Sequence, residues 1–132
     1  MKARFTFLII AVMLTIVIIV ACEKNPTSPY EPEVVNALDN FHFRIDDVSD
    51  HDTSLTYYWR TGGTSANINQ LSSIQGGQAL LRIVGPDSTE TYQTDFIQNG
   101  DFRSGSSSSG TWKITVRLVS FSGMIDFRVQ RR

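Results

Sequence analysis

Residues 46–52, DDVSDHD, form the densest cluster of carboxylates in the chain. They include four aspartates within seven residues: Asp46, Asp47, Asp50 and Asp52. A calcium ion takes about six to eight oxygen ligands at about 2.3–2.6 Å, and clustered aspartates with loop carbonyls can supply them. The alternative is a solvated acidic loop that keeps a sheet edge soluble, since the order of these residues matches no EF-hand loop. The four residues are therefore the calcium candidates, and no other cofactor is indicated.

The chain has two histidines, His42 and His51, and a Ser-His-Asp triad would need one of them as its base. His42 falls on the polar face of an alternating strand pattern, and His51 lies within the acidic segment. No G-x-S-x-G nucleophile elbow accompanies either histidine. These observations favour a binding or structural protein over an enzyme.

Aromatic side chains offer a second kind of binding chemistry, because a sugar ring can stack on an exposed phenol or indole face. Trp59 and Trp112 fall on the apolar faces of alternating patterns, which predicts that both pack in the core. Tyr58 must point opposite to Trp59 and could form a surface patch with Arg60 and Tyr92. These three residues are the ligand-binding candidates, and the alternative is a lone exposed tyrosine on a strand.

The only cysteine, Cys22, ends a secretory signal pattern in which a basic start precedes sixteen mainly apolar residues, 5–20. The run Ile19-Val20-Ala21-Cys22 resembles the lipobox of bacterial lipoproteins. In that family the thiol receives a diacylglycerol and the chain is cut before the cysteine. The resemblance implies a signal peptide at residues 1–21 and lipidation at Cys22. The alternative is an uncleaved signal anchor, because the apolar run is intermediate in length between a signal and a membrane span.

A lipidated Cys22 would anchor the mature protein to a membrane without spanning it, since two or three acyl chains bind far more strongly than one. The basic start indicates that the remainder lies outside the cytoplasm. In this family an aspartate after the cysteine tends to retain the protein at the inner membrane. Glu23 stands there instead, so the outer membrane is favoured. Lipid aside, we expect an envelope protein or glycan as partner.

The segment EKNPTSPYEPE, residues 23–33, has a proline at every third position. Proline fixes its own backbone angle and favours extended predecessors, so residues 22–36 are predicted to be a semi-rigid stalk. Residues 37–132 then form a single domain. Residues 22–132 carry ten basic and thirteen acidic side chains, a balance that gives no indication of nucleic-acid binding.

The apolar period beyond the stalk is two, which predicts strands. Turns are expected at Gly62-Gly63, Gly85-Pro86-Asp87 and Ser122-Gly123, and SGSSSSG at residues 104–110 should be a mobile loop. With an apolar face on every strand and no helical segment after the signal, the chain should be an all-β antiparallel sandwich of about seven to eight strands. The expected strands are residues 41–45, 55–59, 66–71, 79–84, 89–98, 112–118 and 125–129.

Two segments, GQALLRIVGPDSTETY at residues 77–92 and GTWKITVRLVSFSGMIDFRV at 110–129, carry a second resemblance. They resemble the closing half of jelly-roll domains attached to secreted bacterial proteases, the pre-peptidase C-terminal domain and the proprotein convertase P-domain. The matching features are Gly85-Pro86-Asp87, Gly110, Trp112 and Gly123. The resemblance implies a jelly roll and an accessory, non-catalytic role. The expected function is a lipid-anchored binding or structural module of the envelope; the alternative is an accessory domain or subunit of a secreted hydrolase.

Overall fold

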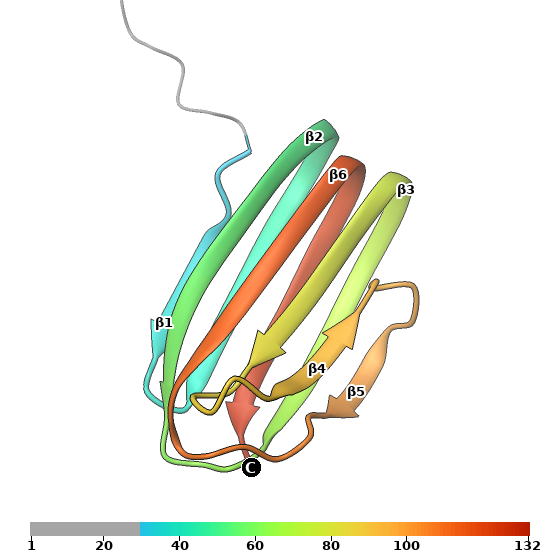
Figure 1. Cartoon of the computed structure of the whole chain (residues 1–132). Helices are drawn as coiled ribbons and strands as arrows, with labels where there is room; N and C mark the ends of the chain where they lie inside the picture. Colours follow the sequence, from blue (N-terminus) through green and yellow to red (C-terminus); the bar gives the residue numbers. More distant parts are fainter. Residues whose placement is uncertain (1–29) are drawn as a thin grey trace, which may run out of the picture.

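The computed structural model describes residues 30–132, which form one antiparallel sheet system of six strands (Figure 1). The predicted signal peptide, lipidated Cys22 and most of the stalk lie outside the described residues. Within residues 30–132 no helix is long and apolar enough to cross a membrane. The strands are β1 (Glu33–Ala37), β2 (Asn40–Thr61), β3 (Ala66–Val84), β4 (Glu90–Thr94), β5 (Gly100–Arg103) and β6 (Gly110–Arg131).

Three of the strands, β2, β3 and β6, are long and bend back over themselves, so each contributes one half to each of two layers (Figure 1). In the first layer β6 lies between the early halves of β2 and β3, and β1 and β5 flank them. In the second layer β6 lies between the late halves of β2 and β3, and β4 flanks β3. The all-β antiparallel sandwich predicted from the sequence is confirmed.

The pairing order identifies the sandwich as a jelly roll. When the halves of the long strands are counted separately, each layer contains four strands in Greek-key connection, and β1 adds a fifth to the first layer. The sequence predicted seven to eight strands, whereas the half-strands number nine among the described residues, since the prediction missed the edge strands β1 and β5. The hydrogen-bonded elements number six among the described residues, because the chain passes between layers without a break in β2, β3 or β6.

The bends of the three long strands gather at one end of the sandwich, the bend end. The backbone there takes positive φ at Asp47, Asp50, Gly77, Ser120 and Gly123, and the registers shift at the same places. Bulges of this kind bend a strand while the ladder continues on either side. The predicted Ser122-Gly123 turn and the predicted acidic loop at 46–52 were therefore wrong: both segments lie inside continuous strands.

The core consists of the inward-facing residues of both layers, as the period of two predicts. Trp59 and Trp112 are fully buried and stand nearly perpendicular, with ring centroids 5.9 Å apart and planes at 84°. Phe127 lies at the centre of a second aromatic cluster with Phe41, Phe43 and Phe96. The prediction that both tryptophans pack in the core is confirmed.

Three local predictions differ from the structure. The predicted stalk extended to residue 36, but β1 already pairs with β2 from Glu33. The predicted strand 89–98 ends at Thr94, and β5, which was not predicted, follows it. Residues 104–110, predicted to be mobile, are anchored by backbone hydrogen bonds from Ser104, Gly105 and Ser107 to Ala66 at the start of β3, to Thr64 just before it and to Thr91 of β4. Backbone amides, which the composition does not reveal, hold this serine-rich loop in place.

Candidate functional site

A hollow of about 370 Å³ lies where the end of β1 meets the late half of β2. We call it the Tyr58 hollow; its lining residues are Asn36, Ala37, Leu38, Tyr58 and Arg60. The side chains of Tyr58 and Leu38 are 64% and 69% exposed, and the two lie together on this surface. The structure therefore brings Tyr58 and Arg60 together, as the sequence predicted, and adds a wall from β1.

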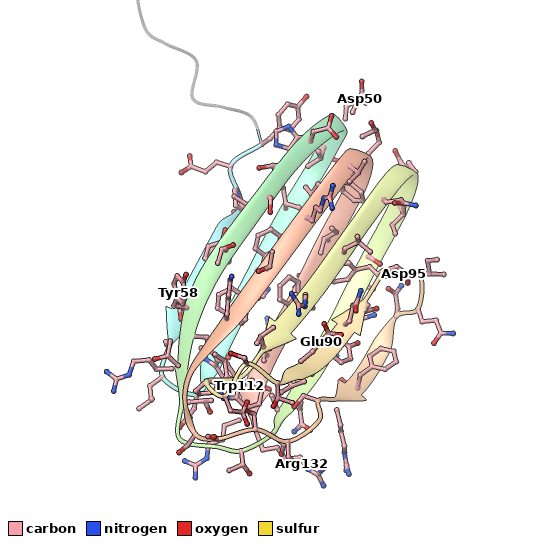
Figure 2. All side chains as sticks on the ribbon, viewed as in Figure 1. Asp50, Tyr58, Glu90, Asp95, Trp112 and Arg132 are labelled. Carbon is pink, nitrogen blue, oxygen red and sulfur yellow. The ribbon has the colours of Figure 1, made fainter. Side chains whose placement is uncertain are left out.

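The wall is fixed by two hydrogen bonds across the edge of the sandwich. The Asn36 side-chain amide donates to the Tyr58 carbonyl at 3.0 Å, and the Trp59 indole donates to the Ala37 carbonyl at 3.1 Å. Because the Trp59 side chain is buried, neighbouring Tyr58 and Arg60 must point to the outside. Figure 2 shows Tyr58 projecting from the edge of the sandwich. The core thus sets the direction of the binding candidates.

The end of the hollow is braced by Asp39, which has a positive φ of 61° in the β1–β2 turn. Its carboxylate accepts hydrogen bonds from the Thr61 hydroxyl at 2.9 Å and the Gly62 amide at 2.8 Å. The Gly62 amide, the Thr61 hydroxyl and nearby Arg131 hold the pKa of Asp39 below its usual value. The turn that carries Leu38 is therefore tied to the next turn of the chain and does not depend on apolar burial.

The groups in the Tyr58 hollow suit a ligand that has both apolar faces and hydroxyl or anionic groups. The phenol ring offers a flat apolar surface, and Leu38 adds an aliphatic neighbour. The Arg60 guanidinium presents several donors in a planar fork. No acid–base pair for bond cleavage is present among the lining residues. The hollow has the chemistry of recognition.

Tyr92 does not join this patch, contrary to the sequence prediction. It lies on β4, at the opposite edge of the second layer, and its ring faces Phe102 of β5 with centroids 6.3 Å apart. Its hydroxyl donates to the Gln70 side chain at 2.9 Å, and burial raises the pKa of its phenol. Tyr92 closes the open edge between the layers, a role that depends on strand order and is invisible in a local pattern.

The four aspartates predicted as calcium candidates are at the bend end, but they do not converge. Asp46 accepts a hydrogen bond from Arg44 at 2.8 Å, and Asp52 accepts one from the Ser120 amide at 2.7 Å. Asp47 and Asp50 occupy positive-φ positions, which aspartate tolerates better than most residues. No group of three or more His, Cys, Asp or Glu side chains arranged to hold a metal occurs in residues 30–132. The cluster shapes and braces the bends.

The two histidines have separate partners. The His42 ring lies 2.7 Å from an Asp126 carboxylate oxygen on the outer face of the first layer. The His51 ring packs on Tyr30, with centroids 4.9 Å apart, at the bend end. The first described residues therefore join the sandwich at the bend end, and β1 runs away from that end (Figure 1). The last residues of β1 line the Tyr58 hollow.

A second cleft, of about 510 Å³, was not foreseen from the sequence. We call it the β3 cleft; it lies between the bend of β3 and the β4–β5 loop, and Ile97 at its border is 75% exposed. The adjacent Phe96 has a positive φ of 62° and a buried ring. The sequence placed Phe96 and Ile97 near the end of the predicted strand 89–98, whereas both lie in the loop that follows β4. Its lining residues are Ser72, Ile74, Gly77, Gln78, Ala79, Leu80, Asp95, Phe96 and Ile97.

Comparisons with known proteins add little to this geometry. No protein-family model matches the chain, and no curated protein matches it. Two solved structures are similar over most of the chain. The crystal structure of accessory secretory proteins 1, 2 and 3 in Streptococcus pneumoniae is 11% identical, covers 84% of this chain and 92% of that chain, and gives a TM-score of 0.38. A structure described as "CBM4 structure and function" is 10% identical, covers 80% of this chain and 81% of that chain, and gives a TM-score of 0.40. Neither similarity bears on function.

Proposed function

We propose that this protein is a lipid-anchored envelope module that binds a glycan at the Tyr58 hollow. The observation that carries the proposal is the exposed Tyr58 ring, held beside Arg60 and Leu38 by hydrogen bonds from the edge of the sandwich. A rigid ring loses little conformational freedom when a sugar stacks on it, and flanking polar groups fix its orientation. The proposed role is recognition, without catalysis.

The anchor half of the proposal rests on the lipobox resemblance at Cys22. The arrangement of the domain is compatible with it, because the chain joins the sandwich at the bend end, far from the Tyr58 hollow. An anchored domain would present the hollow away from the lipid. Palmitate labelling and intact mass of the full chain test the anchor. Label and an acylated mass beginning at Cys22, both lost in Cys22→Ala, support it; an unlabelled chain retaining residues 1–21 contradicts it.

The binding half is tested with the full-length protein in detergent on an array of envelope glycans. Tyr58→Ala should weaken binding of the retained glycans by roughly five- to thirtyfold, and Tyr58→Phe should keep it, because stacking needs the ring and not the hydroxyl. Ile97→Ala is the matched control, since it also truncates an exposed large side chain but at the β3 cleft. If Ile97→Ala loses binding and Tyr58→Ala does not, the glycan binds at the β3 cleft and the proposed site is wrong.

A further inference from the structure

The outer face of the second layer carries a segregated set of basic side chains. We call it the basic face; it consists of Arg60 on β2, Lys113 and Arg117 on β6, and Arg82 on β3. All four side chains are exposed. The acidic side chains on this face are Glu90 of β4, which accepts a 2.6 Å hydrogen bond from Arg82, and Asp52 of β2, which accepts one from the Ser120 amide at 2.7 Å near the bend end. Arg60, Lys113 and Arg117 form no ion pair with any residue of 30–132.

The register places these groups around one point. Thr115 of β6 lies opposite Thr56 on one side and Arg82 on the other. Lys113 and Arg117 flank it along the strand, about 7 Å away in each direction, because a strand rises about 3.4 Å per residue. Neighbouring strands are about 4.8 Å apart, so the cationic groups are within reach of one extended ligand.

The basic face is continuous with the Tyr58 hollow. Tyr58 lies directly opposite Lys113, and Arg60 belongs to both surfaces. The hydroxyls of Thr56, Thr111 and Thr115 lie between the cations on the same face. A ligand that stacks on Tyr58 therefore has donors and positive charge along its continuation over β6 and β3.

The rest of the domain does not share this charge. Residues 30–132 contain nine Lys or Arg and twelve Asp or Glu, so a face with four basic and two acidic side chains runs against the overall balance. On the outer face of the first layer, by contrast, Arg44 is paired with Asp46 and lies near Asp126. Like charges held together without partners oppose folding slightly, and an anionic ligand would relieve that repulsion.

We propose that the glycan bound by this protein is an acidic polysaccharide whose uronate carboxylates contact the basic face. The proposal rests on the function proposed above and adds the ligand class. Guanidinium groups bind carboxylates through paired hydrogen bonds, and Tyr58 supplies the stacking contact that a simple polyanion lacks. Membrane lipid suits the surface less well, because the basic face runs along the side of the sandwich while the chain joins it at the bend end.

The test compares two polymers with the same sugar backbone: polygalacturonate, which carries free carboxylates, and its fully methyl-esterified form, which is neutral. The full-length protein in detergent is titrated with each at low ionic strength, where exposed charges are least screened. The test variant is Lys113→Glu/Arg117→Glu. The matched control is Arg103→Glu/Arg128→Glu, which makes the same charge change at exposed positions on the outer face of the first layer. Melting curves confirm that both variants fold.

The wild-type protein should bind polygalacturonate at least about tenfold more tightly than it binds the methyl ester. The Lys113→Glu/Arg117→Glu variant should bind polygalacturonate at least about tenfold more weakly than wild type does. The control variant should stay within about twofold, and Lys113→Arg/Arg117→Lys should retain binding. Equal affinity for the two polymers, equal loss in the control, or tighter binding of single-stranded DNA of matched charge would overturn the acidic-glycan assignment. If the ester binds as tightly as polygalacturonate and Tyr58→Ala weakens that binding, the proposed glycan-binding function stands without the acidic-ligand assignment. If no array glycan binds, both the proposed function and the ligand class are wrong.

Discussion

Tyr58 and Lys113 stand directly opposite each other, on β2 and β6, on the outer face of the second layer. Cβ atoms of directly opposed residues lie about 4.5–5.5 Å apart, so the phenol ring and the ammonium group are close enough to contact the same part of one ligand. Their strands are positioned by Trp59 and Trp112, which are also directly opposed and point into the core. The geometry of the proposed binding surface therefore depends on the tryptophan pair beneath it.

The first prediction concerns the exposed ring. Tyr58→Ala should weaken glycan binding by about 1–2 kcal/mol, or roughly five- to thirtyfold, because it removes an aromatic contact. Its effect on the free energy of unfolding should stay within about 0.5 kcal/mol, since the side chain is 64% exposed. Titration calorimetry and urea unfolding of the same variant separate the two effects. A large loss of stability would show that Tyr58 serves the fold.

The second prediction concerns the tryptophan pair. Trp112→Ala should destabilise the domain by about 3–5 kcal/mol, because it leaves a large cavity beside Trp59 and frees the Ser108 carbonyl that the indole contacts at 2.9 Å. Hydrogen exchange in residues 104–110 should accelerate in parallel. Thr111→Ala, an exposed change at the adjacent position, is the control and should leave urea unfolding nearly unaltered. Equal midpoints for the two variants would contradict the proposed role of Trp112.

The third prediction concerns the bends. Gly123 has a φ of 138°, and a Cβ there would overlap the Ser73 carbonyl oxygen, so Gly123→Ala should cost about 3 kcal/mol or more. In a domain of about 100 residues this lowers the melting temperature by about 10 °C or more. Gly76→Ala is the control, since its Cβ would meet its nearest neighbours at 3.8 Å without a positive φ. If both variants melt at the wild-type temperature, the strands do not bend as described.

The fourth prediction concerns acid. Hydrogen bonds from Gly62 and Thr61 lower the pKa of Asp39, and hydrogen bonds from Ser107 and Thr89 lower the pKa of Asp87. A carboxyl whose pKa is lowered by folding stabilises the fold above its unfolded pKa of about 3.9, and the contribution disappears as pH falls through the folded pKa. The melting temperature of the protein should therefore decrease as the pH is lowered below about 4.

The variant Asp39→Asn/Asp87→Asn tests this cause. It should melt lower than wild type at pH 7 and show a shallower decline from pH 5 to pH 3, because the titrating groups are gone. Asp95→Asn is the control, since Asp95 lies in the exposed β4–β5 loop. A decline as steep as that of wild type in the double variant would assign the acid sensitivity to other carboxyl groups.

The alternation of apolar residues predicted most of the strands, because each inward position in a two-layered sheet must be buried. It also predicted the buried tryptophans and the outward direction of Tyr58 and Arg60. What it could not distinguish was a reversal of the chain from a bend within a strand. Ser122-Gly123 and the acidic segment have the composition of turns, and only the partner strands show that β6 and β2 continue through them.

The remaining errors have the same origin in long-range contacts. β1 has a weak pattern of its own, and its place in the sheet depends on pairing with β2 and on the Trp59 indole that bonds to Ala37. For this reason the sequence predicted the β2 side of the Tyr58 hollow and missed the side that comes from the edge strand β1. Tyr92 was assigned to the wrong surface because strand order, which local sequence does not contain, separates β4 from β2.

Site-specific photocrosslinking in intact bacteria tests whether a glycan lies against Tyr58 in the cell. A photoreactive phenylalanine analogue is placed at position 58, or at position 97 as the control, in the full chain with Cys22 intact. We expect a light-dependent adduct at position 58 that a glycosidase digests and that the Lys113→Glu/Arg117→Glu background weakens, with none at position 97. A glycosidase-resistant protein adduct at position 58, or an adduct formed at position 97 alone, would contradict the proposed glycan site.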